Sequence, residues 1–301
     1  MTGLLIRNAA QIATGSGPLL RGTALDRLRI HENASIYAEN GTIVAVGPSR
    51  DVDRLVQGSP EIVDAEGSAV MPGFVDSHTH AVFAGSRVDE FVDKIQGASY
   101  LQVAKRAGGI LTTVKAVRAA GKDELKELTR ARVRSALEQG STTMEIKSGY
   151  GLDVESEMKM LDVIAELRAE QPVTLVPTFL GAHAVPPDLS REAYVQQLLE
   201  MLPAAAKKAD FCDVFCDPSY IPVADSRRLL DAARGLGMKL HVHAGQLMND
   251  GGIRMGLDLG ARSMSHLDMI DDDNIARLGS SPTAAILLPG VALFGRTPYP
   301  P

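Results

Sequence analysis

The stretch that decides the fold is Pro72-Gly73-Phe74-Val75-Asp76-Ser77-His78-Thr79-His80. It reads as an apolar strand that begins after a Pro-Gly turn and ends in two histidines one residue apart. Alternate side chains of a strand share a face, so His78 and His80 point the same way and can bind one metal ion through two imidazoles. A His-x-His pair on an exposed loop has no such meaning, so the places of the other histidines decide between the two interpretations.

The chain contains seven histidines, and six of them lie at or just after the carboxyl ends of strand-like segments. These six are His78, His80, His183, His241, His243 and His266, whereas His31 lies outside such a context. Active sites of (β/α) barrels are built at the carboxyl ends of several strands. The pattern therefore indicates a site at one end of a parallel barrel, with His241 deeper in its strand as a packed residue or one that supports a ligand.

Composition limits the class of partner. The 301 residues are 45% hydrophobic and 23% charged, and the net charge is −6 without any block of like charge. Neither nucleic acid nor a membrane is an expected partner, so a small-molecule substrate is predicted. No secretory signal and no apolar run long enough to span a bilayer is evident, which predicts a cytoplasmic protein. Cys212 and Cys216 are predicted to be buried core residues.

Residues 1–65 are predicted to form a small domain of short strands and turns, similar to a β-sandwich. Strand-like segments occur at 4–6, 34–38, 42–46 and 61–64, and Asn40-Gly41 is a hairpin-type dipeptide between the middle two. Four short strands are few for a complete sandwich, so strands from elsewhere are expected to complete this domain.

Residues 66–301 alternate between strand-like and helix-like segments, which is typical of a parallel sheet covered by helices. After the opening strand, strands are expected at 142–146, 173–179, 213–216, 239–243, 262–266 and 284–288, with helices at 123–139, 154–170, 191–209, 225–236 and 251–259. Periodicity alone also allows a doubly wound sheet. The histidines at several strand ends favour the fold class α/β, a (β/α)8 TIM-type barrel that has strands one to seven and lacks its last strand.

These motifs carry a family resemblance. The opening stretch resembles the first barrel strand of the amidohydrolase superfamily, and five further segments resemble the imidazolonepropionase family within it. The segments are Val82-Phe83-Ala84-Gly85-Ser86-Arg87, Gln96-Gly97-Ala98-Ser99-Tyr100, Gly108-Gly109-Ile110, Lys147-Ser148-Gly149-Tyr150-Gly151-Leu152 and Leu180-Gly181-Ala182-His183-Ala184-Val185-Pro186. The resemblance implies metal-dependent hydrolysis of the cyclic amide of 4-imidazolone-5-propanoate to N-formimidoyl-L-glutamate, a step of histidine degradation.

The resemblance also implies roles for particular residues. His78, His80 and His243 match the ligands of one zinc or iron ion, and imidazole suits both metals. Arg87, Tyr150, His183 and Gln246 match positions that contact the substrate, and an arginine fork suits an anionic substrate tail. His266, Gln246 and His183 are the candidate catalytic residues. The position of His266 at the end of the sixth strand has two interpretations: it orients the attacking water or the substrate carbonyl, or it is only a hydrogen-bonded group that supports the site. Some family members have glutamate at position 246, so the identity of the general base stays open.

Two features of the resemblance limit what it implies. Two-metal members usually carry a modified lysine at the end of the fourth strand, and Val214-Phe215-Cys216-Asp217 contains none, so one metal is expected. The family's metal-binding aspartate on the eighth strand has no counterpart in these residues, which predicts a truncated chain with exposed edges on strands one and seven. The alternatives are an inactive or partner-dependent fragment, with a homodimer as one form of partner, and another amidohydrolase such as a nucleobase deaminase.

Overall fold

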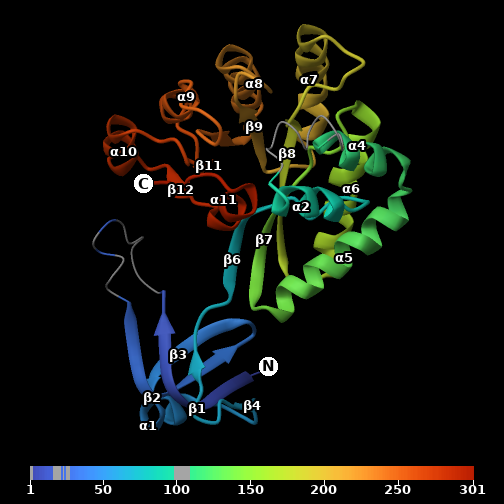
Figure 1. Ribbon diagram of the computed structural model, residues 1–301. Helices are drawn as coiled ribbons and strands as arrows, with labels where there is room; N and C mark the ends of the chain where they lie inside the picture. Colours follow the sequence, from blue (N-terminus) through green and yellow to red (C-terminus); the bar gives the residue numbers. More distant parts are fainter. Residues whose placement is uncertain (1–2, 16–21, 23, 25–27, 98–108) are drawn as a thin grey trace. The chain divides into compact units, whose positions relative to one another are not determined.

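The computed structural model describes residues 3–15, 22, 24, 28–97 and 109–301 (Figure 1). The chain divides into two compact units, Met1–Gly73 and Phe74–Pro301. The first unit extends beyond residue 65 because a short strand, β5 (Ala69–Val70), pairs with β1 (Gly3–Thr14). The motif residues Ala98, Ser99, Tyr100 and Gly108 lie outside the described residues.

The described strands of the first unit form one mixed sheet in the order β3-β2-β1-β4, with β5 also beside β1. The remaining elements are β2 (Arg29–Glu39), β3 (Thr42–Pro48), α1 (Ser49–Val52), the 3-10 helix η2 (Asp53–Leu55) and β4 (Glu61–Asp64). Two small clusters of buried apolar side chains stabilise it, one around Leu5, Tyr37 and Val52 and the other around Ala9, Ile12 and Ala34.

The predicted hairpin at Asn40-Gly41 is confirmed. Both residues have positive φ, 49° and 78°, which a two-residue turn of type I′ requires. Glu39 pairs with Thr42 directly across the turn, so β2 and β3 are antiparallel neighbours. Asparagine and glycine tolerate this backbone conformation better than other residues, and this explains why the dipeptide predicts the turn.

Within the described part of the second unit, seven parallel strands form one sheet in the order β12-β11-β10-β9-β8-β7-β6. Their bounds are β6 (Phe74–Thr79), β7 (Ser141–Lys147), β8 (Thr174–Ala182), β9 (Phe211–Cys216), β10 (Lys239–Ala244), β11 (Ser263–His266) and β12 (Ala284–Ile286). A doubly wound sheet reverses its strand order at a switch point, whereas this order follows the chain throughout. The predicted barrel of seven strands with a separate N-terminal sheet is confirmed.

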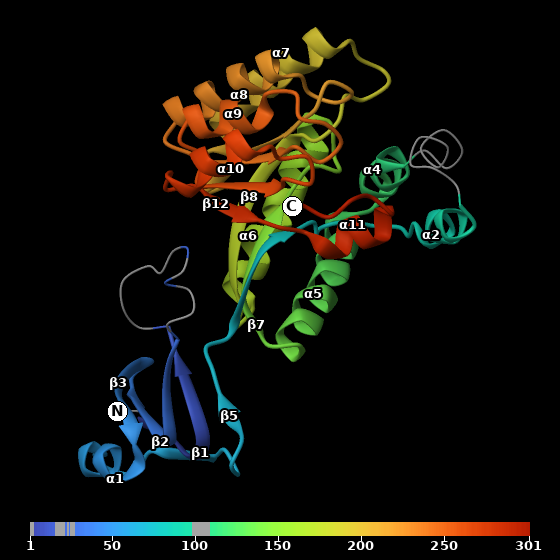
Figure 2. The same ribbon diagram turned by 60° about the vertical axis from the view of Figure 1, so that its left-hand side comes forward.

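Helices alternate with these strands. They are α2 (Val88–Ile95), α4 (Ile110–Ala119), α5 (Lys122–Glu138), α6 (Val154–Glu170), α7 (Arg191–Ala205), α8 (Val223–Gly235), α9 (Gly252–Asp258), α10 (Asp272–Gly279) and α11 (Pro289–Gly295). Figure 2 shows α7, α8, α9 and α10 side by side along the sheet. Among the helices described here, none is both long and apolar enough to cross a membrane.

Local sequence explains where the longer helices begin and which face they bury. The side chain of Asp153 accepts a hydrogen bond from the Ser156 N–H, which caps α6. Within α6, Leu161, Ile164 and Leu167 are three residues apart, so they share one face, and all three are fully buried. Burial of each such side chain contributes about 1.5–3 kcal/mol. This packing holds the strand ends, and the histidines on them, in place.

The two edge strands of the described sheet border one cavity. Residues 74–78 of β6 and residues 286–288 at β12 line a cavity of about 320 Å³. Phe74, Val75 and Leu287 are 53%, 67% and 51% exposed there, which is unusual for apolar residues of a parallel sheet. The exposed edges predicted for the first and seventh strands are therefore present, and the sheet curls until its edges share a cavity.

Candidate active site

The first two histidines of the site are carried by β6. His78 is the second-last residue of β6, and His80 directly follows the end of the strand. Their ring centroids are 5.3 Å apart. Both side chains are half-buried. His78 Nδ1 lies 2.8 Å from the Ser265 hydroxyl, which leaves Nε2 of His78 available to a ligand.

β10 adds a third histidine to this pair. The ring centroid of His243 lies 4.6 Å from that of His78 and 5.6 Å from that of His80. The three side chains offer nitrogen atoms that all lie within 4.8 Å of one another. The carboxyl ends of β6 and β10 meet at the same end of the barrel, and for this reason residues 163 positions apart become neighbours.

Some buried nitrogens of these rings lack hydrogen-bond partners, so they are potential ligands of a metal ion. His80 Nδ1 and His243 Nε2 are buried and have no hydrogen-bond partner among the described residues. A buried polar atom without a partner costs about 1–3 kcal/mol unless something else satisfies it. Three imidazoles with nitrogens within 4.8 Å of one another, two of them with a buried nitrogen that lacks a partner, form a donor set that suits zinc or iron. The residues therefore fit a single metal ion.

Two further histidines surround the cluster. His183 directly follows β8 and stacks on His80, with 4.9 Å between ring centroids and 14° between planes. His266 ends β11, and its ring centroid lies 5.3 Å from that of His243. His266 has a positive φ of 77°, an uncommon conformation for a non-glycine residue that is found at functional sites. Its buried Nδ1 has no partner in the described structure.

Burial keeps these imidazoles neutral. It lowers the pKa of His80 well below the ordinary value, that of His183 to about 3 and that of His266 to about 2, and the charge of neighbouring histidines lowers each of them further. Only a neutral imidazole has a lone pair for a metal or for a proton. Near neutral pH the rings of His80, His183 and His266 are therefore uncharged, with a lone pair available to a cation or a hydrogen-bond donor.

His241 is a packed residue, as its depth in the strand predicts. Its ring stacks on Phe211, with 4.1 Å between centroids and 13° between planes, and its Nδ1 contacts the Ser263 hydroxyl. His241 is 7% exposed and lies two residues before His243 on β10. It does not join the group of potential ligands.

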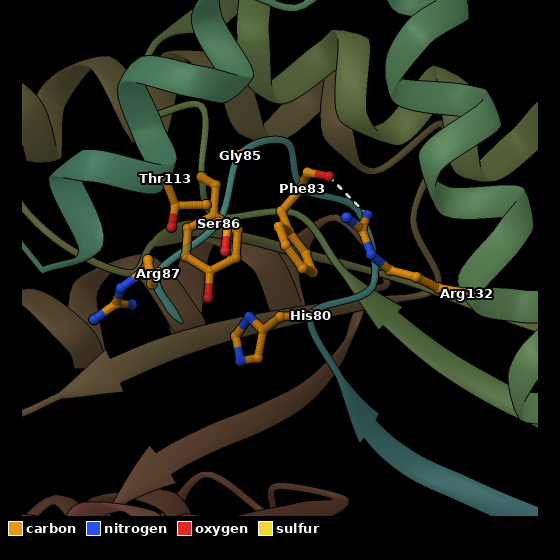
Figure 3. A pocket seen from close by; sticks show the side chains of 8 residues that line it. His80, Phe83, Gly85, Ser86, Arg87, Thr113 and Arg132 are labelled. Carbon is orange, nitrogen blue, oxygen red and sulfur yellow. Dashed lines mark hydrogen bonds between the residues drawn. The ribbon is translucent and has the colours of Figure 1, made fainter. Parts of the chain in front are cut away.

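A pocket of about 420 Å³ opens beside His80 (Figure 3). Its lining residues come from the segment after β6, from α4 and α5 and from the loop after β7: His80, Phe83, Gly85, Ser86, Arg87, Thr113, Arg132 and Tyr150. Figure 3 shows the His80 ring at one side of the pocket and the Arg87 guanidinium at another. The pocket is large enough for a small molecule and has both a cation and a potential metal ligand on its wall.

Arg87 lines this pocket, and its charge is paired. Its Nε lies 2.8 Å and its Nη2 2.5 Å from Glu90 Oε2. The side chain of Glu90 is only 4% exposed, and its Oε1 has no partner in the described residues. Glu90 therefore holds the guanidinium against the pocket wall, and a substrate anion would share the charge of Arg87 with Glu90.

Tyr150 is held by a loop that is fastened to Glu157. The carboxylate of Glu157 accepts hydrogen bonds from the N–H groups of Gly149, Gly151 and Leu152 at 3.0, 2.7 and 3.0 Å. Glu157 is fully buried on α6. The carbonyl of Gly149 in turn lies 3.0 Å from His183 Nδ1, so the same loop orients His183.

Changing Glu157 to glutamine is expected to lower the free energy of unfolding by about 1–3 kcal/mol, because the amide cannot accept all three N–H groups and leaves one of them unsatisfied. Denaturant-induced unfolding measures this effect. Glu155→Gln on the exposed side of the same helix is the matched control and should change stability by less than about 0.5 kcal/mol. Equal stability of both variants would contradict the role given to Glu157.

Arg132 fastens the other wall of the pocket. Its Nη1 donates to the carbonyls of Ala81 and Phe83 at 3.0 and 2.7 Å, and its guanidinium lies 3.5 Å from the centroid of the Phe83 ring. These contacts satisfy the backbone directly after His80 and add a cation–π interaction. Arg132 therefore fixes the course of the segment that leads from β6 to Arg87.

Gln246 lies apart from this pocket. It follows β10 by two residues, is half-buried and is not among the lining residues. Its predicted contact with the substrate stays a prediction.

Several residues that shape the site were not singled out in the sequence. Among them are Glu90, Arg132, Glu145, Lys147, Glu157 and Asp213. One signal could have found part of the set, because Glu145 and Lys147 flank Ile146 in a buried strand and so share a face inside the barrel. The partners of Glu157 and Arg132 are main-chain groups, and no residue type marks these in a sequence.

The chain resembles known proteins along most of its length. The model of the amidohydrolase family matches residues 61–113. The chain is 44% identical over 297 residues to the imidazolonepropionase of Symbiobacterium thermophilum, covering 96% of this chain and 70% of that protein. It is 45% identical over 306 residues to the imidazolonepropionase of Chloroflexus aggregans, covering 96% and 71%. For the imidazolonepropionase of Rubrobacter xylanophilus the identity is 44% over 306 residues, covering 100% and 74%.

Solved structures with the same architecture are more distant in sequence. A triazine hydrolase of Arthobacter aurescens superimposes with a TM-score of 0.70 at 17% identity, covering 98% of this chain and 67% of that chain. An adenosine deaminase of Xanthomonas campestris with bound zinc gives a TM-score of 0.67 at 17% identity, covering 99% and 65%. At these identities the likeness shows the fold alone.

Proposed function

The chain belongs to the imidazolonepropionase family of amidohydrolases, and on this premise we propose that the histidine cluster of its barrel is the reaction site. As a member of this family the chain is a hydrolase that acts on the carbon–nitrogen bond of a cyclic amide. Its substrate is 4-imidazolone-5-propanoate and its product N-formimidoyl-L-glutamate. The observation that carries the location is the group of three histidines at the carboxyl end of the strands, whose nitrogens lie within 4.8 Å of one another and two of which, His80 and His243, have buried nitrogens without partners among the described residues.

We propose that His78, His80 and His243 hold one zinc or iron ion. When bound, such an ion polarises a carbonyl oxygen and lowers the pKa of a bound water to about 7. Three neutral imidazoles add no negative charge of their own to the site. The remaining side chains of the site therefore have to bind the substrate, exclude other water and move protons.

Hydrolysis forms a bond between a water oxygen and the carbonyl carbon, breaks the ring carbon–nitrogen bond and delivers a proton to the leaving nitrogen. His183 contacts the Gly149 carbonyl through Nδ1, so its Nδ1 carries the proton and its Nε2 has a free lone pair. We propose that His266, whose buried Nδ1 is unpartnered within the described structure, orients the attacking water or the substrate carbonyl. A Gln246 amide can orient a reacting group but has no proton to exchange near neutral pH.

The pocket beside His80 is proposed to hold the rest of the substrate. The propanoate tail is an anion, and the guanidinium of Arg87 offers a planar donor fork for a carboxylate. Tyr150 lies on the same wall and offers a hydroxyl to the ring. Binding of the propanoate tail by Arg87 explains why the site would prefer this substrate to a cyclic amide without a carboxylate.

Two earlier alternatives are weighed against this proposal. A nucleobase deaminase is not favoured, because the deaminases with similar folds share only 12–17% of their residues with this chain. The chain spans about seven-tenths of the length of the related imidazolonepropionases, so an inactive or partner-dependent fragment stays open to experiment. A cytoplasmic location and a homodimer likewise stay predictions.

Removal of the metal tests the proposal. Purified protein of residues 1–301 is expected to consume imidazolonepropionate, followed as loss of imidazolone absorbance. Dialysis against a chelator should abolish turnover, and added zinc or iron should restore it, because the ion supplies several kcal/mol of transition-state stabilisation. Turnover that persists in metal-free protein would refute the role of the ion, and a folded sample with neither metal nor turnover would favour the fragment.

A further inference from the structure

A buried group of three charged side chains lies under the histidine cluster. Lys147, at the end of β7, is 1% exposed, and its Nζ lies 2.7 Å from Glu145 Oε1 and 2.9 Å from Asp213 Oδ2. The side chains of Glu145 and Asp213 are 7% and 0% exposed. Taken together the group carries one net negative charge, which is costly to bury unless something compensates it.

Asp213 connects this group to a proposed metal ligand. Its Oδ2 lies 3.0 Å from His243 Nδ1, and its Oδ1 accepts a hydrogen bond from the Val214 N–H at 2.8 Å. The distance to His243 is that of a hydrogen bond, whereas the angle at Nδ1 is not, so the ring has to turn slightly for the bond to form. A carboxylate beside Nδ1 favours the tautomer that carries its proton there. The unpartnered Nε2 of His243 then presents its lone pair to the cluster.

Glu145 connects the same group to β6. Its Oε2 accepts a hydrogen bond from the Thr79 N–H at 3.3 Å, and its main-chain carbonyl accepts one from the Thr79 hydroxyl at 2.6 Å. Thr79 lies between His78 and His80, so this contact fixes the backbone from which both rings project. One connected group of side chains therefore reaches the elements that carry all three proposed ligands.

We propose that Asp213 is a positioning residue that orients His243 for metal binding, and that Lys147 and Glu145 hold Asp213 in place. This inference rests on the proposed metal site. Carboxylates that orient metal-bound histidines commonly raise metal affinity 10–100-fold. The negative charge of the buried group also compensates the charge of the cation, which explains why three charged side chains occupy the inside of a barrel.

The test is the zinc affinity of folded variants, measured by competition with a chromophoric chelator. Asp213→Asn preserves the shape of the side chain and removes its charge, and it should weaken zinc binding about 10–100-fold. The same variant loaded with cobalt should show a shifted visible absorption band, because that band reports ligand geometry rather than stability. Glu145→Gln is a second variant, expected to weaken binding by a smaller factor because it acts through Lys147.

Glu157→Gln is the matched control, since it also neutralises a fully buried carboxylate but one that contacts no proposed ligand. Its zinc affinity should equal that of the wild type. Equal affinities and cobalt spectra of the wild type, Asp213→Asn and Glu145→Gln would overturn the proposal. If Asp213→Asn does not fold, Glu145→Gln decides alone. A wild-type chain that binds no zinc would instead refute the metal site itself.

Discussion

Replacing His243 with alanine is expected to lower kcat/KM by about three orders of magnitude or more. The variant loses one of three imidazoles that are proposed to hold the ion, and the ion supplies several kcal/mol of transition-state stabilisation. Each ~1.36 kcal/mol corresponds to a tenfold change in rate. The fall should appear together with loss of metal from the purified protein, measured by elemental analysis and by imidazolone absorbance on one sample.

His241→Asn is the matched control for this variant. His241 lies on the same strand two residues earlier and packs on Phe211 without joining the cluster. The control should lose stability, by about 0.5–3 kcal/mol, and keep its metal. The assignment of the two histidines would be wrong if His241→Asn lost the ion and His243→Ala retained it.

Replacing Arg87 with alanine is expected to raise KM by about 10–100-fold with a smaller change in kcat. A hydrogen bond to a charged group contributes about 1.5–3 kcal/mol, and Arg87 is proposed to supply a fork of such bonds to the propanoate. Steady-state kinetics with imidazolonepropionate measure the effect. The variant also leaves the buried carboxylate of Glu90 unpaired, so its folding has to be verified alongside.

Arg87→Lys separates charge from geometry, because lysine keeps the charge and loses the planar fork. Its KM should lie between those of the wild type and Arg87→Ala. Arg134→Ala is the control for loss of a cation elsewhere, since Arg134 lies exposed on α5 and pairs only with Glu138 in the contacts described here. If Arg87→Ala bound and turned over substrate like the Arg134 variant, Arg87 would have no role in recognition.

The strands and the histidine cluster could be predicted from the sequence because their signals are local. Each buried parallel strand is a short apolar run, and histidine at the end of such a run is visible without any knowledge of the fold. The strand-end histidines indicate a site at one end of the barrel, because parallel strands bring their carboxyl ends together, and the family resemblance selects His78 and His243 from them as neighbours. Their ring centroids are 4.6 Å apart.

Features that depend on contacts between distant segments could not be predicted. The first unit continues to Gly73 because Ala69 and Val70 pair with Gln11 and Ile12, and a two-residue strand has no pattern of its own. The partnership of Lys147 with Asp213 likewise joins residues 66 positions apart. Lysine and aspartate are usually found at the surface, so their residue types argue against a buried pair.

The pairing of Arg87 with Glu90 shows that a sequence can permit a contact without indicating how deeply it is buried. The two residues are three apart on the same turn, a spacing at which side chains meet in a helix. The sequence permits this pair but does not indicate that Glu90 is buried, and burial is what holds the guanidinium against the pocket. The sequence therefore predicts a substrate contact for Arg87 without its buried partner.

Anomalous diffraction from crystals of the metal-loaded protein, recorded at the zinc and iron absorption edges, tests the central claim most directly. The account predicts one peak per chain, about 2.0–2.1 Å from a nitrogen of each of His78, His80 and His243 if the ion is zinc, and the edge at which it appears identifies the metal. A peak at another site, or a loaded and active crystal with no peak among these three histidines, would contradict it.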